Sequence, residues 1–421
     1  MVHRCLKLFG PFLLLLVTFA SLELGGRALY TRITPERGRA IVSLLLGETR
    51  VAQPTGIDEE GFAVSEVEPR PYYFYVNRPG GKAYGIVQHN GLGHRGPEYS
   101  TAPRPGTLRI LAIGGSTTYG WLLKDYRDAW PHQLELLLSA RLQHPVEVIN
   151  AGLPSGLSTE ALISYALRDR FLGAQAVIIH MGGNDAGAAF YDDYRSDYST
   201  YRSMDAGDAS ARPGERRLLR SFLARTFYAW WLRDGRASSI RTFPDRPLDP
   251  ATALTNARNR DPVGYRRNLD LLVRTVIDEG ALPILFPFYL AEKEVFRGLS
   301  PSHRFGESTY EALKADLEKN VTITREIAAL RSVPFVSLAP GTIPLPDFFD
   351  HCHLRPEGER IKAEFLSDQV VGLVRAGRIH APWKTASSAI NESGSARLRA
   401  RVSPGTGERS LSPLGSPSPG R

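Results

Sequence analysis

The hydrophobic pattern in the middle of the chain alternates between short apolar runs and longer amphipathic stretches. The apolar runs are bounded by turn residues, which is typical of buried strands. The amphipathic stretches repeat their apolar positions with the period of a helix. We expect strands at residues 108–113, 146–150, 176–181, 283–288 and 334–338, and helices at 129–142, 158–170, 262–279, 308–330 and 356–374.

Strands that alternate with helices predict a parallel sheet of about five strands, because parallel neighbours need a crossover helix between them. Ligands of such α/β sheets bind at the carboxyl ends of the strands. The connection between the third and fourth strands is far longer than an ordinary loop. It predicts a largely helical insertion at about residues 187–262.

A serine follows the first predicted strand on a glycine-flanked turn, in the sequence GGSTTYG at residues 114–120. Such a turn between strand and helix presents a hydroxyl at the sheet edge, and the helix N-terminus favours developing negative charge. Ser116 is therefore a candidate nucleophile. Its alternative role is that of a helix cap, which is common for a serine in this position.

A base for this hydroxyl is available in the sequence DHCH at residues 350–353, which comes after the fifth predicted strand. His353 can remove the serine proton, and Asp350 can fix its tautomer and stabilise the imidazolium. His351 remains an alternative base. A metal site of His351, Cys352 and His353 is not expected, since there is no distant pair of Cys or His at zinc spacing, and we expect no cofactor.

Donors for a tetrahedral oxyanion follow the second and third predicted strands. Gly152 ends the sequence NAG, and Asn184 lies in GGND at residues 182–185. The backbone N–H groups of Ser116 and Gly152 and the side-chain amide of Asn184 are suitable donors. Each residue has a simpler reading, Gly152 as a turn residue and Asn184 as a loop cap. Their order at successive strand ends favours a common site.

In this order the residues resemble the SGNH (GDSL-type) hydrolases, whose four motif blocks contribute Ser, Gly, Asn and His. The resemblance covers roughly residues 105–375 and implies a flavodoxin-like three-layer sandwich. The first block reads GGSTT where the family name expects GDSL, which is similar to an exported bacterial branch of the family. The resemblance implies the nucleophile, the oxyanion donors and the Asp/His pair at Ser116, Gly152, Asn184, Asp350 and His353.

The two ends of the chain differ from its middle. An apolar run at residues 8–24 follows Arg4 and Lys7, which is typical of an export signal. We expect it to be an uncleaved anchor in the bacterial inner membrane that leaves the catalytic domain in the periplasm. We divide the chain into an anchor and linker (1–40), an extension that packs on the core (41–104), the hydrolase domain (105–380) and a disordered tail rich in Ser, Gly, Pro and Arg (381–421).

Composition and charge exclude several classes of protein. With 42% hydrophobic and 23% charged residues, the chain is globular. Its net charge of +8 is concentrated at the ends, +4 in residues 1–40 and +5 in residues 376–421, and the rest is nearly neutral. We therefore expect no nucleic-acid partner. The only cysteines, Cys5 and Cys352, indicate no disulfide framework.

Three residues outside the motif blocks are candidate substrate contacts. Asn90 opens the sequence NGLGHRG at residues 90–96, which is also similar to a segment of the exported branch, although a structural loop is the simpler reading. Trp230 and Trp231 lie in an amphipathic stretch at residues 216–234. That stretch can pack on the core, lie on an anionic membrane surface or stack on a substrate.

These observations predict a serine-dependent hydrolase that removes an acyl group from a carbohydrate or lipid of the cell envelope. Two alternatives remain open. The chain could be an extracytoplasmic O-acyltransferase for a polysaccharide, working with a membrane-bound acyltransferase, or a glycan-binding or assembly protein without catalysis. Fold alone does not separate these functions.

Overall fold

The computed structural model describes residues 2–32, 54–57, 63–65, 67–83, 86–191, 195–198, 221, 223–224, 248–301 and 305–383. Within these residues the central sheet consists of four parallel strands in the order β10-β9-β7-β8. The predicted α/β fold with a parallel sheet is confirmed. The strands are β7 (Leu108–Gly114), β8 (Val146–Gly152), β9 (Ala176–His180) and β10 (Leu282–Leu285).

The fifth predicted strand, at residues 334–338, is reduced to a single parallel bridge between Leu285 and Phe335. Leu285 donates to the Pro334 carbonyl and accepts from the Val336 N–H, each at 2.9 Å. β10 ends at Leu285, and Pro334 has no N–H to extend the ladder. The segment therefore occupies the position of a fifth strand without forming one.

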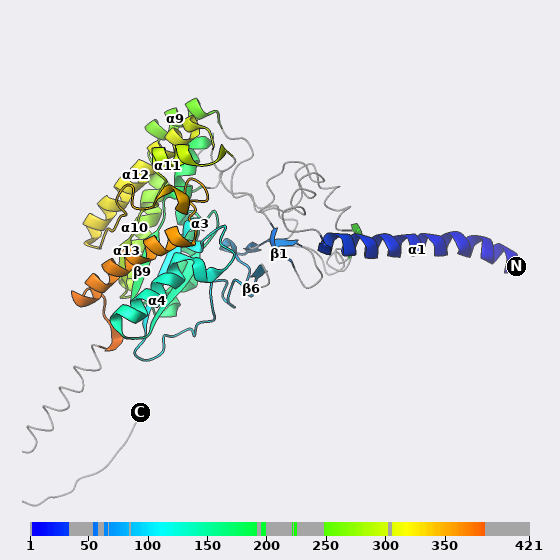
Figure 1. Cartoon of the computed structure of the whole chain (residues 1–421), viewed down its shortest axis with the longest axis horizontal. Helices are drawn as coiled ribbons and strands as arrows, with labels where there is room; N and C mark the ends of the chain where they lie inside the picture. The colour runs from blue at the N-terminus through cyan, green and yellow to red at the C-terminus, as the bar shows by residue number, and fades with distance from the viewer. Residues whose placement is uncertain are drawn as a thin grey trace, which may run out of the picture.

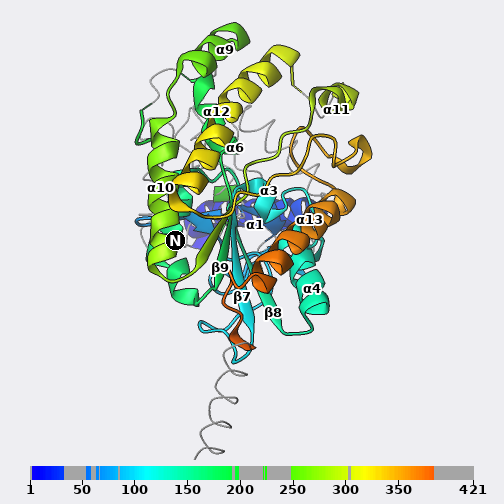
Figure 2. The ribbon, with the colours of Figure 1, turned by 90° about the vertical axis from the view of Figure 1, so that its left-hand side faces the viewer.

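Side chains of alternating direction along the strands build one core on each face of the sheet. Leu108 and Ile110 of β7 pack with α4 (Trp130–Leu142) and α13 (Pro356–Arg375). Leu111 and Ile113 pack with α5 (Ser158–Leu167), α10 (Val263–Asp278) and α12 (Glu307–Arg331). Figure 2 shows the resulting three layers, with α4 and α13 on one side of the strands and α10 and α12 on the other.

The order of the core strands is second, first, third and fourth along the chain, which is the flavodoxin-like order. Its topological switch point lies between β7 and β9, where the crossovers leave in opposite directions. The two segments that follow these strands are α3 (Ser116–Tyr119) and α6 (Gly183–Ala186). The fold therefore brings the serine and asparagine blocks to the same edge of the sheet.

Before the sheet, the described residues form a long helix and three small antiparallel pairs. Figure 1 shows α1 (Val2–Arg32) projecting from the side of the molecule that carries these pairs. The prediction of a membrane-spanning anchor gains no support, since no helix in the described part of the chain is long and apolar enough to cross a membrane. The pairs are β1 (Pro54–Ile57) with β2 (Ala63–Ser65), β3 (Val67–Arg70) with β4 (Phe74–Asn77), and β5 (Lys82–Ala83) with β6 (Ile86–Val87).

The β3–β4 pair packs on the loop that follows β8. The Tyr75 hydroxyl donates to the Pro154 carbonyl at 2.7 Å, and the Asn77 amide donates to the Gly152 carbonyl at 2.9 Å. Tyr75 is fully buried and forms a small apolar cluster with Val67 and Leu153. This part of the extension is thus attached to the edge of the sheet where the motif blocks meet.

The long connection after β9 leaves and returns at neighbouring points. The Leu248 N–H donates to the Phe190 carbonyl at 2.7 Å, and α9 (Pro250–Asn259) then packs along α12. Except for residues 221, 223 and 224, the predicted helix at 216–234 lies outside the described residues, and so do Trp230 and Trp231. The same holds for the tail from residue 384 onward. A short helix, α11 (Lys293–Gly298), follows β10.

Candidate active site

Ser116 begins α3, a single helical turn directly after β7. A side chain at Gly114 would place its Cβ 2.0 Å from the Thr118 Oγ1, so only glycine lets the turn fold back this tightly. Gly120 ends the turn in the left-handed region, with φ of 84°. The N–H of Ser116 lies in the first turn of the helix, where backbone donors have no intrahelical acceptor. It can therefore serve a ligand.

His353 connects the serine to a carboxylate. Its Nε2 lies 2.8 Å from the Ser116 Oγ, and its Nδ1 lies 2.8 Å from the Asp350 Oδ2. A carboxylate can only accept, so Nδ1 carries the proton and donates to Asp350. This tautomer leaves Nε2 to accept the Ser116 hydroxyl, which is the arrangement that general-base catalysis requires.

The loop that carries this pair is tied down at both ends. An antiparallel bridge joins Phe348 to Leu354, and the Phe349 N–H donates to the His353 carbonyl at 2.8 Å. The Asp350 Oδ1 accepts the N–H groups of Cys352 and His353 at 2.9 and 2.8 Å. The carboxylate therefore fixes the turn with one oxygen and the imidazole with the other.

The charge of Asp350 is maintained by these contacts. Burial opposes its ionisation, but the imidazole of His353 and the hydrogen bonds to the carboxylate hold the pKa of Asp350 well below its usual range. The ring of His351, the alternative base, packs edge-on against Phe305, with 4.7 Å between the ring centroids. Burial lowers the pKa of His351 to about 4, although Asp350 opposes the shift. The structure thus brings His353, and not His351, to the serine.

The same loop gathers three possible metal ligands. The ligand atoms of Asp350, His351 and Cys352 lie within 4.8 Å of one another. Burial raises the pKa of the Cys352 thiol well above its usual value, which disfavours the thiolate. A metal ion would also have to share Asp350 with His353. A site that works without metal or cofactor stays a prediction.

Asn184 lies in α6, after β9, and faces residues 116–120, which we call the serine turn. Its Nδ2 donates one hydrogen to the Gly156 carbonyl at 2.9 Å, which leaves the second amide hydrogen for a ligand. The same nitrogen is 2.8 Å from the point where a side chain on Gly115 would begin. The Asn184 amide nitrogen therefore lies beside the residue that directly precedes Ser116.

A buried carboxylate anchors the turn that carries Asn184. Asp185 accepts the Ser158 hydroxyl at 2.6 Å and N–H at 3.1 Å, and the Tyr198 hydroxyl at 2.7 Å. Burial raises the pKa of Asp185, while these hydrogen bonds oppose the shift. The GGND sequence thus supplies a structural anchor with Asp185, while Asn184 keeps one amide hydrogen for a ligand.

The role predicted for Gly152 needs correction. Its N–H donates to the Asn150 Oδ1 at 3.0 Å, so it does not point to a ligand. A Cβ on Gly152 would lie 2.2 Å from the Tyr119 nitrogen, which means that the glycine lets α3 pack against β8. One residue that sequence reasoning missed is Gly156, whose carbonyl accepts a hydrogen bond from the Asn184 amide. In the sequence, Gly156 is the second glycine of NAGLPSG at residues 150–156, and this is the feature that could have identified it.

Asn90 is also corrected as a substrate contact, because its buried side chain is used within its own loop. The Oδ1 accepts the N–H groups of Leu92 and His94, each at 3.0 Å. The Nδ2 donates to the Pro97 carbonyl at 3.2 Å. The simpler reading of this segment as a structural loop therefore agrees with the structure.

Polar groups that sequence reasoning missed lie beneath the serine turn. The Thr117 carbonyl accepts the Trp130 indole N–H at 3.2 Å and the Lys362 ammonium at 3.4 Å. Glu359 accepts the Trp130 backbone N–H at 3.0 Å. Burial lowers the pKa of Lys362 and raises the pKa of Glu359, and each opposes the shift of the other. Only the fold brings these residues of α4 and α13 together.

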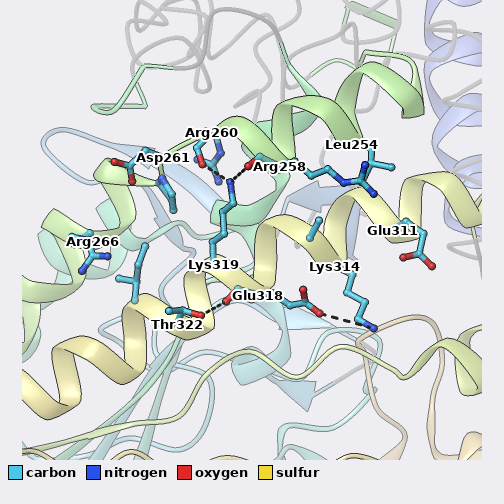
Figure 3. Close-up of a pocket in the computed structure, with 13 residues that line it drawn as sticks. Leu254, Arg258, Arg260, Asp261, Arg266, Glu311, Lys314, Glu318, Lys319 and Thr322 are labelled. Carbon is cyan, nitrogen blue, oxygen red and sulfur yellow. Dashed lines mark hydrogen bonds and ion pairs between the residues drawn. The ribbon is translucent and has the colours of Figure 1, made fainter.

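An open cavity of about 770 Å³ lies away from the serine, where α9, α10 and α12 meet. Figure 3 shows that side chains of both charge signs line it. The Lys319 ammonium donates to the carbonyls of Arg258 and Arg260, each at 2.6 Å, and Lys314 lies 4.0 Å from Glu318. No nucleophile paired with a base lines this cavity, so the chemistry belongs to the Ser116 site.

A serine hydroxyl in contact with an imidazole whose tautomer is fixed by a carboxylate, at the carboxyl edge of a parallel sheet, is the arrangement of a serine hydrolase. The chain belongs to the GDSL-like lipase/acylhydrolase family, whose model matches residues 112–361. It is therefore an ester-hydrolysing enzyme, and its membership of the SGNH (GDSL-type) hydrolase family is confirmed.

Several solved structures are similar to the chain. A lipase/acylhydrolase from Enterococcus faecalis is 16% identical, covering 63% of this chain and 96% of that one, with a TM-score of 0.35. The aryl esterase of M. smegmatis is 18% identical, with coverages of 63% and 99% and a TM-score of 0.38. Est24, a carbohydrate acetylesterase from Sinorhizobium meliloti, is 15% identical, with coverages of 63% and 99% and a TM-score of 0.34. No curated protein matches the chain.

Proposed function

We propose that the chain hydrolyses O-acyl esters of a carbohydrate or lipid of the cell envelope through an acyl-Ser116 intermediate. The observation that carries this proposal is the continuous contact from the Ser116 Oγ to His353 and on to Asp350, with both distances at 2.8 Å. Export by the N-terminal leader is part of the proposal, since the apolar run behind Arg4 and Lys7 favours it.

The first half of the reaction forms the acyl-enzyme. The Ser116 Oγ attacks the ester carbonyl carbon while His353 Nε2 takes the hydroxyl proton, and Asp350 stabilises the imidazolium. The negative charge on the carbonyl oxygen is met by the Ser116 N–H and the free amide hydrogen of Asn184. Collapse of the tetrahedral intermediate breaks the bond to the alcohol, which leaves with the proton of His353.

The second half releases the acid. His353 removes a proton from water, and the resulting oxygen attacks the acyl carbon in the same oxyanion site. The Ser116 Oγ leaves and recovers its proton from His353. If a sugar hydroxyl takes the place of this water, the same site performs O-acyl transfer.

The experiment compares release of p-nitrophenol from acetyl and longer esters by the full chain and by its variants. We expect Ser116→Ala and His353→Ala to lower kcat by at least about 10³-fold, because each removes an essential part of one unit. His351→Gln is the matched control within the same loop, and we expect it to keep activity of the wild-type order. The preference for acyl chain length then separates acetyl from lipid substrates.

Two results would change this proposal. If the wild type hydrolyses these esters no faster than Ser116→Ala, the Ser116 site does not catalyse ester hydrolysis. Slow hydrolysis that is accompanied by acyl transfer to an added oligosaccharide would favour the O-acyltransferase, which would then be expected to work with a membrane-bound acyltransferase.

A further inference from the structure

The segment NGLGHRG, residues 90–96, lies before the 112–361 match of the family model. It nevertheless reaches the serine turn through Arg95. This side chain is buried, with 4% of the residue exposed. Its guanidinium donates to three backbone carbonyls, of Tyr119 at 2.9 Å, Gly120 at 2.6 Å and Leu123 at 2.8 Å.

The serine turn needs such donors. α3 is only four residues long, so most of its carbonyls have no intrahelical partner. A cation at the C-terminal end of a helix also interacts favourably with the helix dipole. Arg95 supplies both the donors and the charge, at the opposite end of the turn from the N–H of Ser116.

Further contacts fix the direction of the guanidinium. The Arg95 carbon Cζ lies 4.3 Å above the centre of the Tyr119 ring, a cation–π contact. The Tyr119 hydroxyl is 2.8 Å from the Nε2 of buried His89, and the Gln88 Oε1 accepts from Arg95 at 3.2 Å. The extension therefore holds the side chain as well as the backbone of the last residue of α3.

The backbone of Arg95 is attached to the sheet. Its N–H donates to the Asn150 carbonyl of β8 at 3.0 Å. The Asn150 side chain in turn donates to the Tyr119 carbonyl at 3.3 Å and accepts the Gly152 N–H. Arg95 thus connects the extension, the second strand and the serine turn through a few short contacts.

We infer that Arg95 is a positioning residue for the Ser116 nucleophile, so the extension completes the active site although it lies outside the family match. The inference rests on the proposed function only in taking Ser116 as the nucleophile. Arg95 itself does not touch the ester. It acts by fixing the turn that places the Ser116 hydroxyl against His353 and the Ser116 N–H against the oxyanion.

The chain offers a matched control in Arg109. This guanidinium is also buried and also donates to backbone carbonyls, of Leu172 at 2.7 Å and Thr101 at 3.1 Å. Arg109 lies near the start of β7, however, at the end of the strand opposite to Ser116. Loss of either arginine removes a buried cation, but only loss of Arg95 releases the serine turn.

The test compares Arg95→Met, Arg95→Lys and Arg109→Met in the full chain, at a temperature where circular dichroism shows each to be folded. We expect Arg95→Met to lower kcat about 10- to 100-fold with KM little changed, since a small displacement of a reacting group has this effect. Arg95→Lys should recover part of the loss. Arg109→Met should keep the wild-type kcat per folded molecule, even if its melting temperature falls.

Amide hydrogen exchange at residues 116–120 provides a second measurement that needs no substrate. We expect faster exchange there in Arg95→Met than in Arg109→Met. Equal kcat per folded molecule in the two Met variants, or equal exchange of the serine turn, would overturn the inference. Failure of the proposed function would give a different result, because the activity of the wild type would then equal that of Ser116→Ala. The exchange data would still decide whether Arg95 holds the serine turn.

Discussion

Asp350 determines which nitrogen of His353 carries the proton. Replacing it by Asn leaves the shape of the loop nearly unchanged but presents an amide that can donate to Nδ1, which favours the tautomer with the proton on Nε2. That imidazole cannot accept the Ser116 proton. We expect Asp350→Asn to lower kcat by about 10²- to 10⁴-fold with a smaller change in KM, measured with p-nitrophenyl acetate at neutral pH.

Asp347→Asn is the control for this substitution, since it makes the same chemical change in the same loop. In the structure it is the Asp347 backbone carbonyl, which the substitution keeps, that accepts the Arg355 N–H at 2.8 Å. Activity of Asp350→Asn equal to that of Asp347→Asn would mean that the tautomer of His353 is fixed in another way.

The residues of the site could be predicted to different degrees. Ser116, Asn184, Asp350 and His353 were accessible because strand ends of a parallel sheet meet at one edge. The role of Gly152 was not, since the direction of its N–H depends on the side chain of Asn150. A glycine that binds an anion and one that allows close packing look alike in a sequence.

Close packing of α3 on β8 depends on the missing side chain of Gly152. A Cβ there would meet backbone atoms of Tyr119 and Thr118 at 2.2 to 2.8 Å, and backbone cannot move aside as the end of a side chain can. We expect Gly152→Ala to lower the melting temperature and kcat together, because overpacking costs about 1–3 kcal/mol and shifts the serine turn. Thermal unfolding and p-nitrophenyl acetate hydrolysis measure the two effects.

Gly372→Ala provides the comparison. Gly372 lies in α13 with no atom within 4 Å of the added Cβ, and alanine in a helix is more favourable than glycine by about 1 kcal/mol. We therefore expect Gly372→Ala to be neutral or stabilising and fully active. If Gly152→Ala behaved in the same way, the packing argument for Gly152 would be wrong.

Elements with strong periodicity were predicted almost to the residue. The expected helices at 262–279 and 356–374 correspond to α10 (Val263–Asp278) and α13 (Pro356–Arg375). The apolar run at residues 334–338 could not be distinguished from a loop in the sequence. Such a run forms a strand only if the neighbouring strand continues beside it, and β10 ends at Leu285. The small pairs of the extension and α9 lacked a clear apolar pattern, since they rest on a core that other elements provide.

At the scale of the whole molecule, several histidines are buried in a neutral form. Burial lowers the pKa of His89 to about 4 and the pKa of His180 to about 3. The Nδ1 of His89 donates to the Arg78 carbonyl, so its Nε2 accepts from the Tyr119 hydroxyl. The nearby Arg95 charge also disfavours protonation of His89. The burial of His89 and His180 could not be predicted from composition, because a residue count does not distinguish buried from exposed histidines.

The lowered pKa values of His89 and His180 predict that each residue destabilises the folded protein in mild acid. A histidine of the unfolded chain takes up a proton below about pH 6.5, whereas His89 in the folded protein does so only near pH 4, so the unfolded state is favoured as the pH falls between these values. Asp316 acts in the opposite direction, because burial raises its pKa to about 6 despite its ion pair with Arg260, and the folded state then gains a proton first. Asp185 and Glu359, whose pKa burial also raises, act in the same direction as Asp316, so the contribution of one histidine is measured by substituting it.

The contribution of His89 can be isolated by urea unfolding at pH 7 and pH 5. Between these values His89 should account for a loss of about 2 kcal/mol in the free energy of unfolding. We expect His89→Gln, although less stable than wild type at pH 7, to lose about that much less on acidification. His380→Gln removes an exposed histidine and should follow wild type. If His89→Gln showed the same pH dependence as His380→Gln, protonation of His89 would not oppose folding, and its contact with Tyr119 would have to persist in the charged form.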